Sequence, residues 1–384
     1  MKNIAILGST GSIGQNTLEV IRHFPGRFRV IALSANSNID ILCSQIEEFH
    51  PQLVCIGDQA VGLDLRARIS SSTKVFIGED GLDEMIRDKR IDEIVLAIGG
   101  SAALSPLLAA IENGKPVALA NKEALVMAGH LIMAKAKRKK VKLIPVDSEQ
   151  SAIWQCLQGQ DCNRLKNIYL TASGGPLRQT NIADLKNISI RRVLKHPRWK
   201  MGKKITVDSA NLMNKGLEVL EAMCLFNVGP DKIKILIHPE AIIHSMVEFI
   251  DGVVLAQLSV TDMRIPIQYA LTYPQRLSNS IPSVDFYKLG RLNFRKPDFK
   301  RFPCLGLAYR VARQLGTAPC VLNAANEVSV NEFLKSRLDF VSIPKVIEKV
   351  LAKHHNKVNP DLEDIQEADA WARIQASEVI INFK

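Results

Sequence analysis

The sequence predicts an α/β protein that begins with a doubly wound parallel sheet. Short apolar runs alternate with helix-like segments over about the first 150 residues, which is the pattern of such a sheet. Beyond that point the alternation stops, and from about residue 300 the chain reads as helical. A chain of 384 residues is also too long for one small domain, so we expect two or three domains.

The first apolar run, at residues 3–7, leads into a glycine turn that opens a helix. Gly8, Gly11 and Gly14 follow at a spacing of three, and residues 15–24 have helical periodicity. Glycines let the backbone approach a pyrophosphate closely, and the helix N-terminus favours its negative charge. The turn therefore predicts a Rossmann-like dinucleotide-binding domain, with GxxGxxG in place of the commoner GxGxxG.

The end of the second predicted strand, at residues 28–35, indicates which dinucleotide is bound. NAD-binding domains usually place an Asp or Glu there to hold the ribose 2′-hydroxyl group. Here Asn36, Ser37 and Asn38 follow the strand, and no acid occurs before Asp40. Amide and hydroxyl groups can donate to a 2′-phosphate without repelling it, so the sequence favours NADP.

Further strands are predicted within residues 53–57, 74–78, 93–100, 116–126 and 141–147. The last of them is followed by two acids, Asp147 and Glu149. If both continue the strand they point to one face, and their carboxylates converge. Two converging anions repel each other, which predicts a divalent cation between them. A solvated corner between strand and helix is the alternative interpretation of these two residues taken alone.

The middle of the chain carries polar motifs that suit an anionic ligand. Residues 167–176 read as a strand that ends in Ala-Ser-Gly-Gly, which can present backbone N–H groups and the Ser173 hydroxyl to an anion. The basic, non-periodic segment 194–204 could close over a phosphorylated substrate. An ordinary turn and an exposed loop are the alternatives for these two segments.

Residues 204–223 predict a short strand followed by a helix, with Ser209 as its N-cap. Gly216 would lie inside this helix, where glycine costs about 1 kcal/mol relative to alanine, so we expect another group to approach closely there.

Asn214 and Glu218, four residues apart, would share one face of that helix, with Lys215 beside them. Asn, Lys and Ser side chains can bind a phosphate, and Glu218 could add a third carboxylate to Asp147 and Glu149. Three carboxylates suit Mg²⁺ or Mn²⁺.

Composition and charge limit the partners and the compartment. The net charge of +11 fits anionic ligands, but the basic residues are scattered and aromatic residues make up only 5%, so we expect phosphorylated small molecules and no nucleic acid. Glycines and a proline interrupt the apolar stretch 94–111, so no membrane span is expected. Seven cysteines without a CxxC pair, and no visible secretory signal, predict a cytoplasmic location.

Eight motifs spread over nearly the whole chain resemble, in this order, the 1-deoxy-D-xylulose 5-phosphate reductoisomerase family. They read GSTGSIG, ANKE, VDSE, ASGGP, HPRWKMGKK, VDSANLMNKGLE, HPEAIIHSMV and LNAANEV. The resemblance implies a homodimeric enzyme that uses NADPH and Mg²⁺, Mn²⁺ or Co²⁺. It would rearrange and reduce a phosphorylated ketose, 1-deoxy-D-xylulose 5-phosphate, to 2-C-methyl-D-erythritol 4-phosphate in non-mevalonate isoprenoid biosynthesis.

The resemblance also implies domains and site residues. The domains are an NADPH-binding domain (1–147), a catalytic α+β domain (148–278) with a mobile loop at about 173–203, a linker (279–303) and a C-terminal helical domain (304–384). The implied metal ligands are Asp147, Glu149 and Glu218. These three residues and Lys122 are the implied catalytic residues. The implied substrate contacts are Ser148, Glu149, Ser173, His196, Trp199, Ser209, Asn214, Lys215 and Glu218. The implied cofactor contacts are Thr10, Gly11, Ser12, Ile13, Asn36, Ser37, Asn38, Asn121, Lys122, Glu123 and Gly202.

The chain departs from the family pattern at a few positions. Gln150 stands where His is expected, Arg198 where Asn or Thr is expected, and Asn36-Ser37 where a basic residue is expected. Two other functions remain open on the sequence. A simpler NADP-dependent semialdehyde or homoserine-type dehydrogenase would need no three-carboxylate metal site. A non-catalytic NADPH-sensing regulator would bind the cofactor without turnover.

Overall fold

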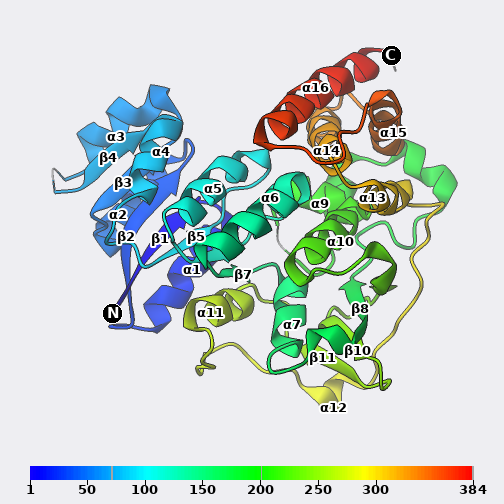
Figure 1. The fold of residues 1–384 in the computed structure, drawn as a ribbon, viewed down its shortest axis with the longest axis horizontal. Coiled ribbons are helices and arrows are strands. Elements are labelled where there is room, and N and C mark those ends of the chain that lie inside the picture. The colour runs from blue at the N-terminus through cyan, green and yellow to red at the C-terminus, as the bar shows by residue number, and fades with distance from the viewer. Residues whose placement is uncertain (71, 200, 383–384) are drawn as a thin grey trace. The chain divides into compact units, whose positions relative to one another are not determined.

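The computed structural model describes residues 1–70, 72–199 and 201–382, and Figure 1 shows their fold. Two compact units are formed. The first contains Met1–Ala124, Ile132–Ser151 and Asp262–Ile281, and the second contains the rest of the chain. The segment Asp262–Ile281 thus packs within the first unit, although most of it falls in the predicted catalytic domain. The domain boundaries given above stay predictions, and Lys200, in the predicted mobile loop, lies outside the described residues.

The first unit is built on a seven-stranded parallel sheet with the order β4-β3-β2-β1-β5-β6-β7. Its strands are β1 (Lys2–Leu7), β2 (Phe28–Ala35), β3 (Leu53–Ile56), β4 (Lys74–Ile77), β5 (Glu93–Leu96), β6 (Val117–Leu119) and β7 (Leu143–Pro145). Strand β1 pairs with both β2 and β5, so the winding direction reverses beside it. The predicted doubly wound sheet is confirmed, and its first glycine turn lies at the reversal point, where such sheets bind ligands.

Helices accompany the strands of this sheet. They are α1 (Ser12–His23), α2 (Ile39–Phe49), α3 (Gly62–Arg68), α4 (Gly78–Ile86), α5 (Leu104–Glu112), α6 (Glu123–Lys139) and, from later in the chain, α11 (Arg264–Thr272). The central strand residues Ile4 and Ile6 are fully buried, and Leu18 of α1 joins them in one core. Burial on both faces explains why the strands are continuously apolar rather than alternating.

The second unit contains a mixed sheet with the order β11-β10-β8-β9. Its strands are β8 (Leu165–Ala172), β9 (Ile233–Ile237), β10 (Ile243–Phe249) and β11 (Val254–Leu258). Strand β10 is antiparallel to β8 and β11, whereas β9 is parallel to β8. The strand predicted within residues 167–176 is therefore present as β8, which begins slightly earlier, at Leu165.

Helices make up most of the rest of this unit, and the helical tail is confirmed (Figure 1). They are α7 (Ser148–Cys156), which starts in the first unit, α8 (Ile190–Val193), α9 (Lys203–Ala210), α10 (Met213–Phe226), α12 (Phe286–Leu289), α13 (Pro303–Gln314), α14 (Ala318–Leu334), α15 (Ile343–Lys353) and α16 (Leu362–Ile381). None of the helices in the described part of the chain is long and apolar enough to cross a membrane.

Gly216 allows α10 and α13 to pack closely. A Cβ atom built on Gly216 would lie 2.5 Å from the Cβ of Ala308 in α13. This separation is too short for two carbon atoms that are not bonded to each other. The expected close approach at this glycine is therefore confirmed.

Two expectations about local structure were wrong. Residues 203–210 form the helix α9 and not a strand, so Ser209 lies in its last turn and is no N-cap. The run Ile-Thr-Val at 205–207 favours a strand locally, but tertiary packing decides otherwise, since Val207 and Ala210 are fully buried in the core of the second unit. Strand β7 ends at Pro145 and Glu149 belongs to α7, so strand geometry does not bring its carboxylate to Asp147.

Candidate active site

In the first unit, a lysine and two carboxylates lie at the carboxyl ends of neighbouring strands. Lys122 follows β6 and Asp147 follows β7, and because β6 and β7 are adjacent and parallel, these residues meet at one edge of the sheet. The Lys122 ammonium group forms an ion pair with Asp147, and its side chain is 94% buried. The Ser148 hydroxyl donates to Oε2 of Glu149 at 2.5 Å.

In the second unit, Glu218 is buried in α10 among donors from the same helix. Asn214 Nδ2 donates to its Oε1 at 2.6 Å, and Lys215 Nζ donates to its Oε2 at 2.5 Å. The shared helix face predicted for these residues is therefore present. Lys215 is as deeply buried as Glu218, so the ion pair compensates two charges that would be costly alone.

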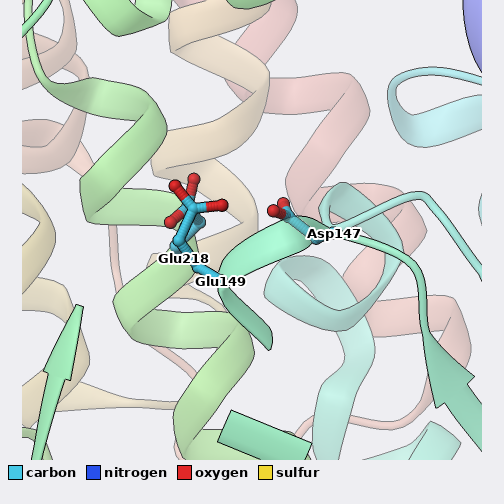
Figure 2. A group of neighbouring side chains, drawn as sticks. All are labelled: Asp147, Glu149 and Glu218. Atoms are coloured by element: carbon cyan, nitrogen blue, oxygen red, sulfur yellow. The ribbon is translucent and has the colours of Figure 1, made fainter. Parts of the chain in front are cut away.

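The carboxylates of Asp147, Glu149 and Glu218 form one cluster. Each side chain offers one oxygen, and the three oxygens lie within 4.8 Å of one another. Figure 2 shows the carboxylates of these three residues facing one another. All three side chains offer carboxylate oxygens, which suit hard cations such as Mg²⁺ and Mn²⁺. The donor set therefore fits the predicted divalent cation.

A separate cluster of Ser173, His196 and Ser209 lies in the second unit. His196 Nε2 stands between the two hydroxyl groups, 3.2 Å from Ser173 Oγ and 3.1 Å from Ser209 Oγ. The glycines after Ser173 make this possible, because a Cβ atom on Gly175 would lie 2.6 Å from the carbonyl oxygen of Ser209. Gly175 also has a φ of +66°, which favours glycine. Three residues far apart in the sequence thus form one polar cluster.

The His196 ring is held in one neutral form. Its Nδ1 accepts a hydrogen bond from the backbone N–H of Trp199 at 2.9 Å and faces that of Arg198 at 3.2 Å. The proton of the neutral ring therefore resides on Nε2, which points at the serines. Burial and the nearby Arg178 guanidinium lower the pKa of His196 to about 4. His196 therefore presents a neutral N–H donor, with the Arg178 guanidinium nearby. Sequence reasoning missed Arg178, although this residue closely follows the ASGGP turn.

Trp199 and two further histidines have packing partners. The Trp199 ring meets the edge of His244, with ring centroids 6.2 Å apart. His238 is fully buried, and its Nε2 accepts from the backbone N–H groups of Ile242 and Ile243 at 3.2 Å. His238 thus supports the start of β10.

Only one glycine of the first turn is free of a packing role. Gly8 has a φ of +89°, and its Cβ would lie 2.7 Å from the carbonyl oxygen of Ala97. A Cβ on Gly14 would lie 2.4 Å from the Cα of Ser9. A Cβ on Gly11 would meet nothing closer than 3.4 Å. Fold packing therefore explains Gly8 and Gly14, whereas no packing contact requires glycine at position 11.

The remaining predicted cofactor residues lie at the ends of strands or helices. Thr10, Gly11, Ser12 and Ile13 lie where the β1 turn enters α1, Asn36 and Ser37 follow β2, and Gly202 precedes α9. Asn38 caps α2, since its side chain accepts from the N–H of Ile41 at 3.2 Å. The Asn121 amide donates to the carbonyl oxygens of Ile98 and Gly100, both at 3.0 Å, and to Glu123. The Asn121 side chain thus ties the ends of β5 and β6 together.

Family models and similar proteins identify the family of this chain. Models of 1-deoxy-D-xylulose 5-phosphate reductoisomerase match residues 4–129, and those of its C-terminal domains match 143–226 and 258–375. The chain is 50% identical over 374 residues to the 1-deoxy-D-xylulose 5-phosphate reductoisomerase of Caldanaerobacter subterraneus, covering 97% of this chain and 98% of the relative. The chain belongs to the 1-deoxy-D-xylulose 5-phosphate reductoisomerase family.

Other members of the family agree along the whole chain. The Desulfosudis oleivorans relative is 50% identical over 99% of this chain and 100% of its own length. A structure of the Zymomonas mobilis reductoisomerase in complex with NADPH has a TM-score of 0.92 at 41% identity, covering 99% of both chains. A reductoisomerase structure with NADPH, fosmidomycin and magnesium has a TM-score of 0.93 at 39% identity, covering 99% and 98%.

Proposed function

We propose that this chain converts 1-deoxy-D-xylulose 5-phosphate to 2-C-methyl-D-erythritol 4-phosphate, with NADPH as the hydride donor and a divalent cation, in non-mevalonate isoprenoid biosynthesis. The observation that carries the proposal is the cluster of Asp147, Glu149 and Glu218 in a chain of this family. A simpler dehydrogenase has no use for three converging carboxylates.

The carboxylate cluster would hold Mg²⁺ or Mn²⁺ against the oxygens of the sugar. When bound, the cation supplies Lewis acidity for the rearrangement of the ketose skeleton and stabilises negative charge on oxygen. Lys122 would orient Asp147, and Ser148 would orient Glu149, through the contacts described above. Asn214 and Lys215 do the same for Glu218, and their donors also suit the substrate phosphate.

The cluster of Ser173, His196 and Ser209 would bind the phosphate. Its hydroxyl groups and the Nε2–H of His196 are neutral donors, and Arg178 adds positive charge nearby. Trp199 would cover the sugar, and closure of the basic segment would exclude water.

The turn at Thr10–Ile13 would receive the pyrophosphate of NADPH, with Gly11 as the point of close approach. Asn36, Ser37 and Asn38 would face the 2′-phosphate. NADPH held by these residues would supply the hydride that, with a proton, reduces the aldehyde formed by the rearrangement to an alcohol.

The test is NADPH oxidation with 1-deoxy-D-xylulose 5-phosphate, measured with Mg²⁺, with Mn²⁺ and with EDTA. We expect turnover that EDTA abolishes and that either cation restores. Turnover that is insensitive to EDTA would contradict the metal site, but the protein would still be a reductase. NADPH binding without turnover would favour a non-catalytic NADPH-sensing regulator.

We also propose a homodimer and a cytoplasmic location. Phe286 and Tyr287 are exposed large apolar side chains that a second copy of the chain could cover. All seven cysteines are free thiols, as expected in a reducing compartment. Light scattering of the purified protein and fractionation of cells test these two proposals.

A further inference from the structure

One contact in the second unit links the sequence motifs VDSANLM and LNAANEV. Asp208 is the acid of the VDSANLM segment and directly precedes Ser209, and Asn326 belongs to the LNAANEV segment of α14. Both are buried, with 1% and 0% of their surface exposed. Asn326 Nδ2 donates to Asp208 Oδ1 at 2.9 Å across 118 residues of sequence.

The Asp208 carboxylate is also bound from its own helix. Lys204, one turn earlier in α9, forms an ion pair with Oδ2 at 2.9 Å and reaches solvent with its side chain. Burying a carboxylate is costly unless its charge is compensated and its oxygens are hydrogen-bonded. Lys204 compensates the charge but moves with α9. Asn326 lies on another helix, so its hydrogen bond fixes α9 relative to α14.

Fixing Asp208 determines where Ser209 points. Consecutive residues of an α-helix are about 100° apart around its axis, so the rotation that turns Asp208 toward α14 also sets the direction of Ser209. A helix rotation of about 15° would move a side-chain oxygen by about 1 Å, given its distance from the axis. The hydrogen bond of 3.1 Å between His196 and Ser209 would not survive such a shift.

We propose that Asn326 and Asp208 are positioning residues for the phosphate end of the substrate site. Their hydrogen bond holds α9 in the rotation that keeps Ser209 against His196 and Ser173. The C-terminal helix α14 thus takes part in substrate binding without touching the substrate. This inference rests on the proposed function, because it assigns the Ser173, His196 and Ser209 cluster to the substrate phosphate.

The test compares Asn326→Leu with the matched control Asn323→Leu. Asn323 lies one turn earlier in α14 and is equally buried, but its amide donates to Glu327 within the same helix, at 3.2 Å. Both variants remove a buried amide from α14, and only Asn326→Leu removes the bond to α9. The measurements are kcat and KM for 1-deoxy-D-xylulose 5-phosphate, the Kd of NADPH and the unfolding midpoint in urea.

We expect Asn326→Leu to raise KM for the substrate about tenfold more than Asn323→Leu does, since it loses a bond to a charged group and displaces Ser209. The Kd of NADPH should stay within about twofold of the wild-type value, because the cofactor turn belongs to the other unit. Asn326→Asp alone sets two acceptor carboxylates against each other, and adding Asp208→Asn restores a donor facing an acceptor. This double variant should recover substrate KM relative to Asn326→Asp alone.

Equal KM changes in Asn326→Leu and Asn323→Leu would overturn the inference, as would a double variant no better than Asn326→Asp. A wild-type protein that does not turn over the substrate would instead refute the proposed function. In that case, inorganic phosphate is the probe for the cluster. Stabilisation by phosphate that Asn326→Leu weakens and Asn323→Leu keeps would support the positioning role, and equal stabilisation of both variants would refute it.

Discussion

Replacing Glu218 with glutamine tests the metal site most directly. The substitution keeps the shape and one acceptor oxygen of the side chain, but it removes one of the three charges in the cluster. Removing groups that only support a metal ligand costs about 10- to 100-fold in metal affinity. Because Glu218 would be a ligand itself, we expect the Mg²⁺ concentration for half-maximal activity to rise at least about 100-fold, equivalent to about 2.7 kcal/mol.

The same substitution also affects stability, because Lys215 loses its charged partner. Lys215 is only 4% exposed, and Nζ lies 2.5 Å from Glu218 Oε2. Removing one partner of a buried pair costs about 3–5 kcal/mol, and the retained amide oxygen should reduce this to about 1.5–3 kcal/mol. Urea unfolding measures this loss separately from metal affinity, which a Mg²⁺ titration of NADPH oxidation reports.

Glu221→Gln is the matched control for this experiment. Glu221 lies one turn further along α10 and is fully buried, but it is not a member of the carboxylate cluster. We expect its Mg²⁺ requirement to stay within about threefold of wild type, well short of the change at Glu218. A folded Glu218→Gln protein with a wild-type Mg²⁺ requirement would refute the assignment of Glu218 as a ligand.

Three further predictions follow from the geometry. Gly11→Ala should keep the wild-type stability but raise the Kd of NADPH at least about tenfold, whereas Gly8→Ala should lose about 1–3 kcal/mol of unfolding free energy because its φ is +89°. Gly216→Ala should cost about 1–3 kcal/mol through overpacking against Ala308, and adding Ala308→Gly should recover much of it. His196→Gln should leave the shape of the pH profile of KM unchanged from about pH 5.5 to about pH 8.5.

Burial lowers the pKa of His196 from its ordinary value of 6.5 to about 4, so the folded imidazole stays neutral over this range. As the pH falls, the unfolded chain takes up the proton before the folded chain does. His196 therefore lowers the free energy of unfolding as the pH falls from about 6.5 to about 4. An ionisation near pH 6.5 in the wild-type KM profile that His196→Gln removes would contradict a neutral ring. Equal NADPH affinity in wild type and Gly11→Ala would refute the prediction for Gly11. No recovery of stability when Ala308→Gly is added to Gly216→Ala would refute the overpacking at Gly216.

Local sequence patterns predicted much of the fold. Apolar runs, a glycine turn and helical periodicity are short-range signals, and they located the strands of the parallel sheet, the first turn and the helical tail. The spacing of Asn214 and Glu218 likewise depends on one helix alone, so their contact could be predicted. The pair Asp147 and Glu149 indicated the proposed cation site, although through a strand that does not continue to Glu149.

Tertiary structure decided what depends on partners distant in sequence. Packing against the core of the second unit makes residues 203–210 a helix despite their β-branched run, and so places Ser209 in a last turn rather than at a cap. The neutral state of His196 depends on burial and on Arg178, which no spacing rule connects to it. The bond from Asn326 to Asp208 exists only because folding brings α14 to α9. The sequence determined which groups are available, and long-range packing determined which of them meet, because burial free energy depends on neighbours that local periodicity does not specify.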